Sequence, residues 1–175
     1  SLQLDPGNVK AHNNLALALH GAGRPSESFE HFAAYLNVYP DDDTVRHSYA
    51  MAMIDAGEFQ QAADVLTALA SAKPDDALIQ YDLGRALGGL KRYEEAAEAN
   101  RRALSLHPDF VKAMNNLGFM LTLSGQVDEA LATLDQALRL EPENLDTLFN
   151  IGYACAAAGR TAEAEEKFHA VLEKN

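Results

Sequence analysis

The chain is poor in the residues from which several kinds of site are built. Its 175 residues include one cysteine and no tryptophan. A single cysteine cannot form an intramolecular disulfide or supply a cysteine-based zinc module. No stretch without a charged or amide side chain is longer than that at residues 151–159, which is about half the length of a membrane-crossing helix. Because no signal-peptide pattern opens the chain, we expect a soluble, cytoplasmic protein without membrane insertion.

Basic side chains are scarce relative to acidic ones. The chain has 14 lysines and arginines against 26 aspartates and glutamates, which gives a net charge of −12. Such a charge repels the phosphate backbone of nucleic acids, so we expect no binding of DNA or RNA.

Proline is present at regular intervals. Five of the six prolines are spaced 34 residues apart, at Pro6, Pro40, Pro74, Pro108 and Pro142. A constant period of this length is typical of a tandem-repeat protein. Two further positions of every repeat hold only small residues, which are Ala16, Ala50, Gly84, Gly118 and Gly152 in one row and Ser28, Ala62, Ala96, Ala130 and Ala164 in the other. Small residues at fixed positions predict paired helices that approach each other closely.

Each repeat is expected to contain two helices. The first helix follows an asparagine or aspartate suited to cap it, at Asn8, Asp42, Asp76, Asp109 and Asn144. It ends at a turn that holds glycine in four repeats and lysine in one, at Gly23, Gly57, Lys91, Gly125 and Gly159. The second helix ends before the next proline, because proline cannot continue a helix.

The fourth repeat shows the full pattern most clearly. It reads Met114-Asn-Asn-Leu-Gly118, followed by Ala130, Leu134, Ala137 and Pro142. This pattern resembles the tetratricopeptide repeat, and the resemblance covers essentially the whole chain. It implies an all-α fold, an α-solenoid in which tandem 34-residue helix–turn–helix repeats form a right-handed superhelix. The first helices would line a concave groove. The family's large aromatic residue near the start of each first helix is replaced here, by His12, Arg46, Gln80, Met114 and Leu148.

The period also divides the chain into domains. Residues 1–8 would be the tail of a truncated preceding repeat, and five repeats would follow at residues 9–42, 43–76, 77–110, 111–144 and 145–175. We therefore expect a fragment or a mature piece of a longer array. Incompletely capped ends predict a tendency to stack end to end, or a further domain in the full protein.

One face of each first helix carries polar residues that packing does not require. Asparagine recurs eight residues after the proline at Asn14, Asn116 and Asn150. Asparagine is a poor helix former, so its recurrence needs a reason. The resemblance implies one reason, since several peptide-binding members of the family hold the ligand backbone with an asparagine at this place. The equally weighted alternative is that these amides bond a neighbouring helix and fix the packing of the repeats.

Aromatic residues flank the asparagine row toward the end of the chain. When left exposed in a concave surface, such residues are typical anchors for a partner, although they also pack between adjacent helices. The candidate peptide-binding groove comprises Asn14, Asn116, Asn150, His47, Met51, Tyr81, Asp82, Arg85, Phe119, Phe149 and Tyr153. Its mixed charges leave the sign of the ligand open.

No pattern of catalytic or metal-ligating residues stands out. Cys155 lies in an otherwise apolar row, which predicts a buried and inert thiol. The six histidines fall at six different repeat positions, so we expect no metal, no cofactor and no enzymatic activity. Asn100 is unusual, because its row faces the core in the other repeats and no partner for its amide is evident from the sequence.

The sequence therefore favours a non-enzymatic scaffold that binds an extended peptide or a segment of a partner protein in the groove. Two alternatives stay open. The chain could be the substrate-recruiting arm of a larger enzyme, such as a glycosyltransferase or sulfotransferase, or a module that self-assembles through its open ends.

Overall fold

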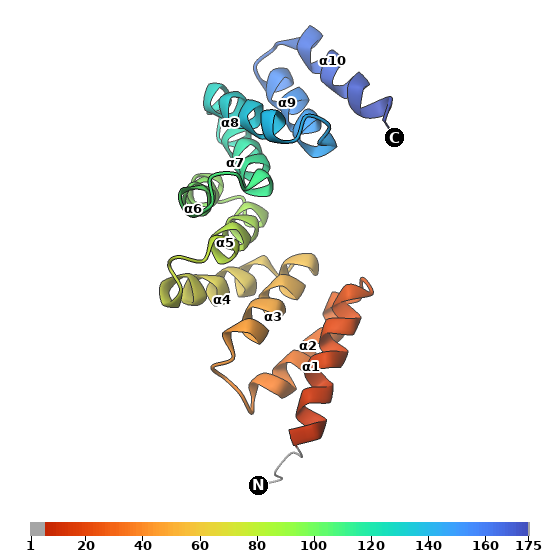
Figure 1. Ribbon diagram of the computed structural model, residues 1–175, viewed down its shortest axis with the longest axis vertical. Coiled ribbons are helices and arrows are strands. Elements are labelled where there is room, and N and C mark those ends of the chain that lie inside the picture. Colours follow the sequence, from red (N-terminus) through yellow and green to blue (C-terminus); the bar gives the residue numbers. More distant parts are fainter. Residues whose placement is uncertain (1–5, 175) are drawn as a thin grey trace. The chain divides into compact units, whose positions relative to one another are not determined.

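The structure is a computed structural model, and it describes residues 6–174. These residues form ten α-helices, and no strand is found among them (Figure 1). In chain order the helices are α1 Pro6–Gly21, α2 Pro25–Leu36, α3 Asp43–Asp55, α4 Phe59–Ala72, α5 Ala77–Gly89, α6 Tyr93–Leu106, α7 Val111–Leu123, α8 Val127–Leu140, α9 Leu145–Ala157 and α10 Thr161–Leu172. Odd-numbered helices are the first helices of the repeats and even-numbered helices the second. The expected all-α organisation in tandem helix pairs is confirmed.

The chain divides into two compact units. Unit 1 ends at Pro74 and contains α1 to α4, whereas unit 2 begins at Asp75 and contains α5 to α10. Within each unit, every helix packs against the next one along the chain. The first helices also contact one another, α1 with α3 in unit 1 and α5 with α7 and α7 with α9 in unit 2. Successive first helices therefore share one face within each unit.

The starts of the first helices follow the capping prediction in three repeats. The side chains of Asp42, Asp76 and Asn144 accept hydrogen bonds from main-chain N–H groups in the first turn of α3, α5 and α9. The prediction is wrong for Asp109, because Phe110 occupies the cap position of α7 and its ring packs against other aromatic rings. It is also wrong for Asn8, which lies inside α1.

The described part of helix α1 starts at Pro6. The expected tail of a preceding repeat falls mainly on residues 1–5 and so lies outside the described residues.

The turns between paired helices require a left-handed backbone. Gly23, Gly57, Gly125 and Gly159 have φ angles of 73° to 84°, and Lys91 adopts the same conformation with φ 61°. A side chain is disfavoured there because its Cβ approaches the following carbonyl oxygen. Lys91 therefore replaces glycine in the sequence of this turn but keeps the left-handed backbone conformation of the other four turns.

We expect the substitution Lys91→Gly to raise the free energy of unfolding by about 1 kcal/mol, because it relieves this strain. Chemical denaturation followed by circular dichroism measures the change. Lys112→Gly is the matched control, since it places glycine at an exposed site in the first turn of α7, where the backbone is helical, and should not raise the stability. A Lys91→Gly protein that is no more stable than the wild type would contradict the prediction.

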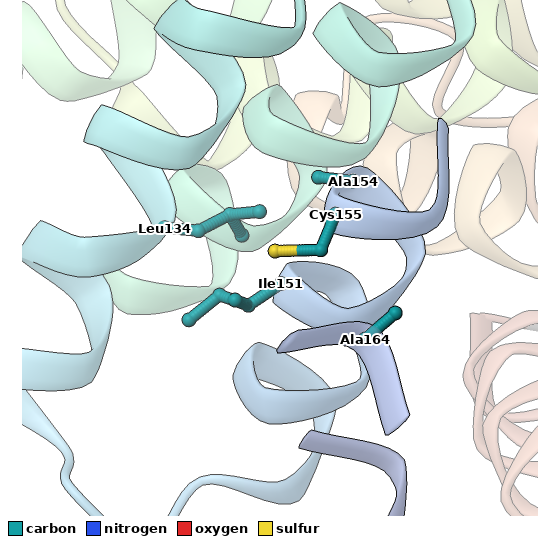
Figure 2. Close-up of a cluster of buried hydrophobic side chains, with 5 residues drawn as sticks. All are labelled: Leu134, Ile151, Ala154, Cys155 and Ala164. Carbon is teal, nitrogen blue, oxygen red and sulfur yellow. The ribbon is translucent and has the colours of Figure 1, made fainter. Parts of the chain in front are cut away.

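The row of small residues brings paired helices into close contact. A Cβ atom added at Gly118 would lie 2.5 Å from Leu134 Cγ, and one added at Gly152 would lie 2.8 Å from Phe168 Cε1. Glycine is thus needed where the partner helix presents a large side chain. Figure 2 shows the core that results between α8, α9 and α10, formed by Leu134, Ile151, Ala154, Cys155 and Ala164. The expected burial of Cys155 is confirmed, and this burial raises the pKa of its thiol.

Candidate functional site

The candidate site residues fall in both units, and each unit is described separately. In unit 2 they lie on α5, α7 and α9, which are neighbouring first helices. We call these residues the inner face of unit 2, and they are Tyr81, Asp82 and Arg85 on α5, Asn116 and Phe119 on α7, and Phe149, Asn150 and Tyr153 on α9.

Two aromatic rings on α9, those of Phe149 and Tyr153, are the most exposed side chains of this face. The rings of Phe119 and Tyr153 lie 5.5 Å apart between their centroids and so join the two helices. Tyr153 remains 37% exposed and Phe149 remains 48% exposed. Phe149 also packs against Phe168 of α10, at 5.6 Å between ring centroids. Packing between helices therefore uses only part of each ring, and much of the aromatic surface is open to a partner.

Tyr81 is more enclosed than the rings on α9. Its ring packs against Phe110, with the centroids 5.0 Å apart. Burial is the main cause that raises the pKa of the Tyr81 hydroxyl, and the nearby positive charge of Arg85 partly offsets it. The negative charge of Asp146 on α9 also contributes to the raised pKa of this hydroxyl.

Asp82 and Arg85 form an ion pair on α5. Arg85 Nη1 donates to Asp82 Oδ1 at 3.3 Å. The side chain of Asp82 is 5% exposed and that of Arg85 is 27% exposed. Asp82 is predicted from the sequence to lie on the ligand-binding face, but its carboxylate is buried and pairs with the guanidinium of Arg85. This arrangement favours a structural role for the aspartate.

The two asparagines of unit 2 are bonded to preceding helices. Asn116 Nδ2 donates to Oδ1 of Asn100 on α6 at 3.2 Å, and Asn150 Nδ2 donates to the main-chain oxygen of Asn115 on α7 at 3.4 Å. Both asparagines thus make the hydrogen bond to a neighbouring helix that the sequence left open as an alternative to ligand binding. Both side chains are only partly buried, so ligand binding by their remaining polar atoms stays a prediction.

Asn100 has the partner that the sequence did not reveal. Its side chain is fully buried, and its Nδ2 donates to the main-chain oxygen of Ala96 at 2.7 Å while its Oδ1 accepts from Asn116. A sixteen-residue separation between the two asparagines carries no local signal, which is why the sequence pattern does not predict the pair.

In unit 1 the candidate residues are less concentrated. Asn14 on α1 is exposed, whereas His47 and Met51 on α3 are partly buried. One polar contact between these two helices joins His20 to Asp55, with His20 Nε2 2.8 Å from Asp55 Oδ2. Residues 6–174 contain no group of three or more histidine, cysteine or acidic side chains that could hold a metal ion.

Paired helices in tandem, with an open polar and aromatic face on the first helices of unit 2, define a helical-repeat scaffold. The model of the tetratricopeptide repeat family matches residues 50–118 and 124–175. The chain belongs to the tetratricopeptide repeat family. No curated protein sequence matches it.

Several solved structures share the fold. MamA of Desulfovibrio magneticus RS-1, from residue 41 to its end, is 20% identical over 94% of this chain and 93% of that chain, with a TM-score of 0.82. TTC0263, a thermophilic tetratricopeptide repeat protein of Thermus thermophilus, is 22% identical over 94% of this chain and 90% of that chain, with a TM-score of 0.78. At these identities the likeness establishes the fold.

None of the helices within residues 6–174 combines the length and the apolar character that crossing a membrane requires. The cytoplasmic location stays a prediction.

Proposed function

We propose that the protein is a non-enzymatic scaffold that binds an extended segment of a partner protein on the inner face of unit 2. The observation that carries the proposal is the exposure of Phe149 and Tyr153, at 48% and 37%, beside the partly buried asparagines of the same face. Membership of the tetratricopeptide repeat family supports it, because solenoids of this kind use extended faces for binding.

The expected contributions to the binding free energy assign different roles to the aromatic side chains and the asparagines of this face. An aromatic anchor that a partner buries contributes about 2 kcal/mol, whereas a neutral hydrogen bond from an asparagine contributes about 0.5–1.5 kcal/mol. Affinity should therefore depend mainly on Tyr153 and Phe149. The asparagines would set the direction and register of the bound chain. Lys112 and Asp146 are both exposed on these helices, so the face favours neither sign of ligand charge.

We expect Tyr153→Ala to weaken binding about tenfold, because the partner loses a large anchor. The probe is a fluorescent peptide of fixed sequence, selected on the wild-type chain from a displayed library of unstructured peptides, and fluorescence anisotropy gives its Kd. Leu140→Ala is the control, since Leu140 is 45% exposed but lies at the end of the second helix α8. Equal affinity of the wild type and both variants, with unchanged circular dichroism, would refute binding on this face.

Two alternative functions, substrate recruitment for a larger enzyme and self-assembly through the ends of the repeat array, stay predictions. Recruitment of a substrate to an attached enzyme would use the same face, and the gene sequence beyond position 175 tests it. Self-association through the ends would use apolar side chains such as Leu15 and Leu172, which are 46% and 70% exposed. Concentration-dependent light scattering measures it. The absence of catalysis likewise stays a prediction.

A further inference from the structure

Asn100 occupies a position where the other repeats place a large apolar side chain. The equivalent residues are Phe32, Leu66, Leu134 and Phe168. Asn100 is fully buried all the same, and it is packed so tightly that a Cβ atom at Gly84 would collide with its Nδ2. A buried amide in an apolar row is costly unless both of its ends are hydrogen-bonded, so its retention calls for a role.

Hydrogen bonding fixes which way the Asn100 amide points. The main-chain oxygen of Ala96 can only accept, so the group that lies 2.7 Å from it must be the Asn100 nitrogen. The Asn100 oxygen is then directed at Asn116. Because that oxygen is also only an acceptor, Asn116 must offer its nitrogen to it, at 3.2 Å. A backbone carbonyl on α6 thus determines the orientation of a side chain on α7.

The same orientation arises independently on the next first helix. Asn150 Nδ2 donates to the main-chain oxygen of Asn115, which again can only accept. The side-chain nitrogen is therefore turned toward α6 in Asn116 and toward α7 in Asn150. Both residues are only partly buried, and neither side-chain oxygen is among the buried atoms that lack a partner, so these oxygens can offer acceptors to a bound chain.

We propose that Asn100 is a positioning residue for the peptide site: it holds the Asn116 amide so that its oxygen faces the ligand and accepts a peptide N–H. This inference rests on the proposed function and adds the chemistry of recognition. Asn116 and Asn150 read hydrogen-bond donors of an extended backbone, which every peptide other than a proline-rich one supplies irrespective of its sequence.

The test uses Asn100→Leu in the full chain. Leucine is the natural residue at the matching position of α8, where Leu134 packs over Gly118, and Gly84 supplies the same space here. The variant should therefore fold with at least the wild-type stability. Binding of the selected peptide should fall about three- to tenfold, because the Asn116 amide is no longer held in one orientation.

A double-mutant cycle separates positioning from general damage. In an Asn116→Ala background, Asn100→Leu should change the Kd less than about twofold, since there is no amide left to orient. An equal loss of affinity in both backgrounds would overturn the inference and would indicate a packing effect. In the wild-type NMR spectrum the Asn116 side-chain N–H protons should exchange slowly with solvent, and this protection should be lost in Asn100→Leu.

Failure of this inference is distinguishable from failure of the proposed function. If Asn116→Ala weakens peptide binding and Asn100→Leu does not, binding on the face stands and the positioning role falls. If neither Asn116→Ala nor Tyr153→Ala affects peptide binding, the site itself is wrong and both proposals fall.

Discussion

Replacing Leu134 by alanine is expected to lower the free energy of unfolding by about 3 kcal/mol, within the usual range of about 2–5 kcal/mol for a buried leucine. The Leu134 side chain of α8 is fully buried, and it contacts both helix α7 and helix α9. It lies over Gly118 of α7, and it packs in the cluster with Ile151 and Cys155 of α9 (Figure 2). The cavity left by the substitution would weaken α7–α8 and α8–α9 packing together.

Urea denaturation followed by circular dichroism measures this loss. Gln136→Ala is the matched control, because Gln136 is an exposed residue of the same helix and its replacement should change stability by less than about 0.5 kcal/mol. In a repeat array each repeat contacts only its neighbours, so the transition should also broaden as the α7–α9 region unfolds first. A loss below about 1 kcal/mol would show that neighbouring side chains collapse into the space.

The regular parts of the fold could be predicted because they depend on local chemistry and on a fixed period. The cap residues Asp42, Asp76 and Asn144 act within one turn of their own helices. The pairing of Gly118 with Leu134 recurs at Gly152 with Phe168, since one period carries both partners along together. A period read from the sequence therefore predicts which residues meet inside a repeat.

The polar contacts between helices could not be predicted in the same way. Asn14 and Asp82 occupy the same repeat position, yet Asn14 is exposed and Asp82 is buried. Helical geometry gives the direction of a side chain from its own axis, but the neighbouring side chains decide how deeply it is covered. The link between Asn100 and Asn116 likewise depends on how closely α6 and α7 approach, which no residue spacing states.

The ion pair on α5 supplies a second large expected effect. Arg85→Leu should lower the free energy of unfolding by about 2–3 kcal/mol, because the buried Asp82 carboxylate loses the guanidinium that compensates its desolvation. The figure is below that for a fully buried pair, since Arg85 is 27% exposed and water screens part of the interaction. Asp82→Leu combined with Arg85→Leu should recover stability to within about 1 kcal/mol of the wild type, because no charge is left buried.

The control for this pair is Arg102→Leu, which removes an exposed ion pair with the same 3.3 Å separation, between Arg102 and Glu98 on α6. It should cost less than about 0.5 kcal/mol, as exposed pairs do. Denaturation of all the variants at one pH and ionic strength gives the comparison. If the Arg85→Leu protein were as stable as the control, the Asp82 carboxylate would not depend on Arg85, and a direct role of Asp82 toward a ligand would again have to be tested. If the double variant stayed as unstable as the single one, the loss would lie in side-chain packing rather than in charge.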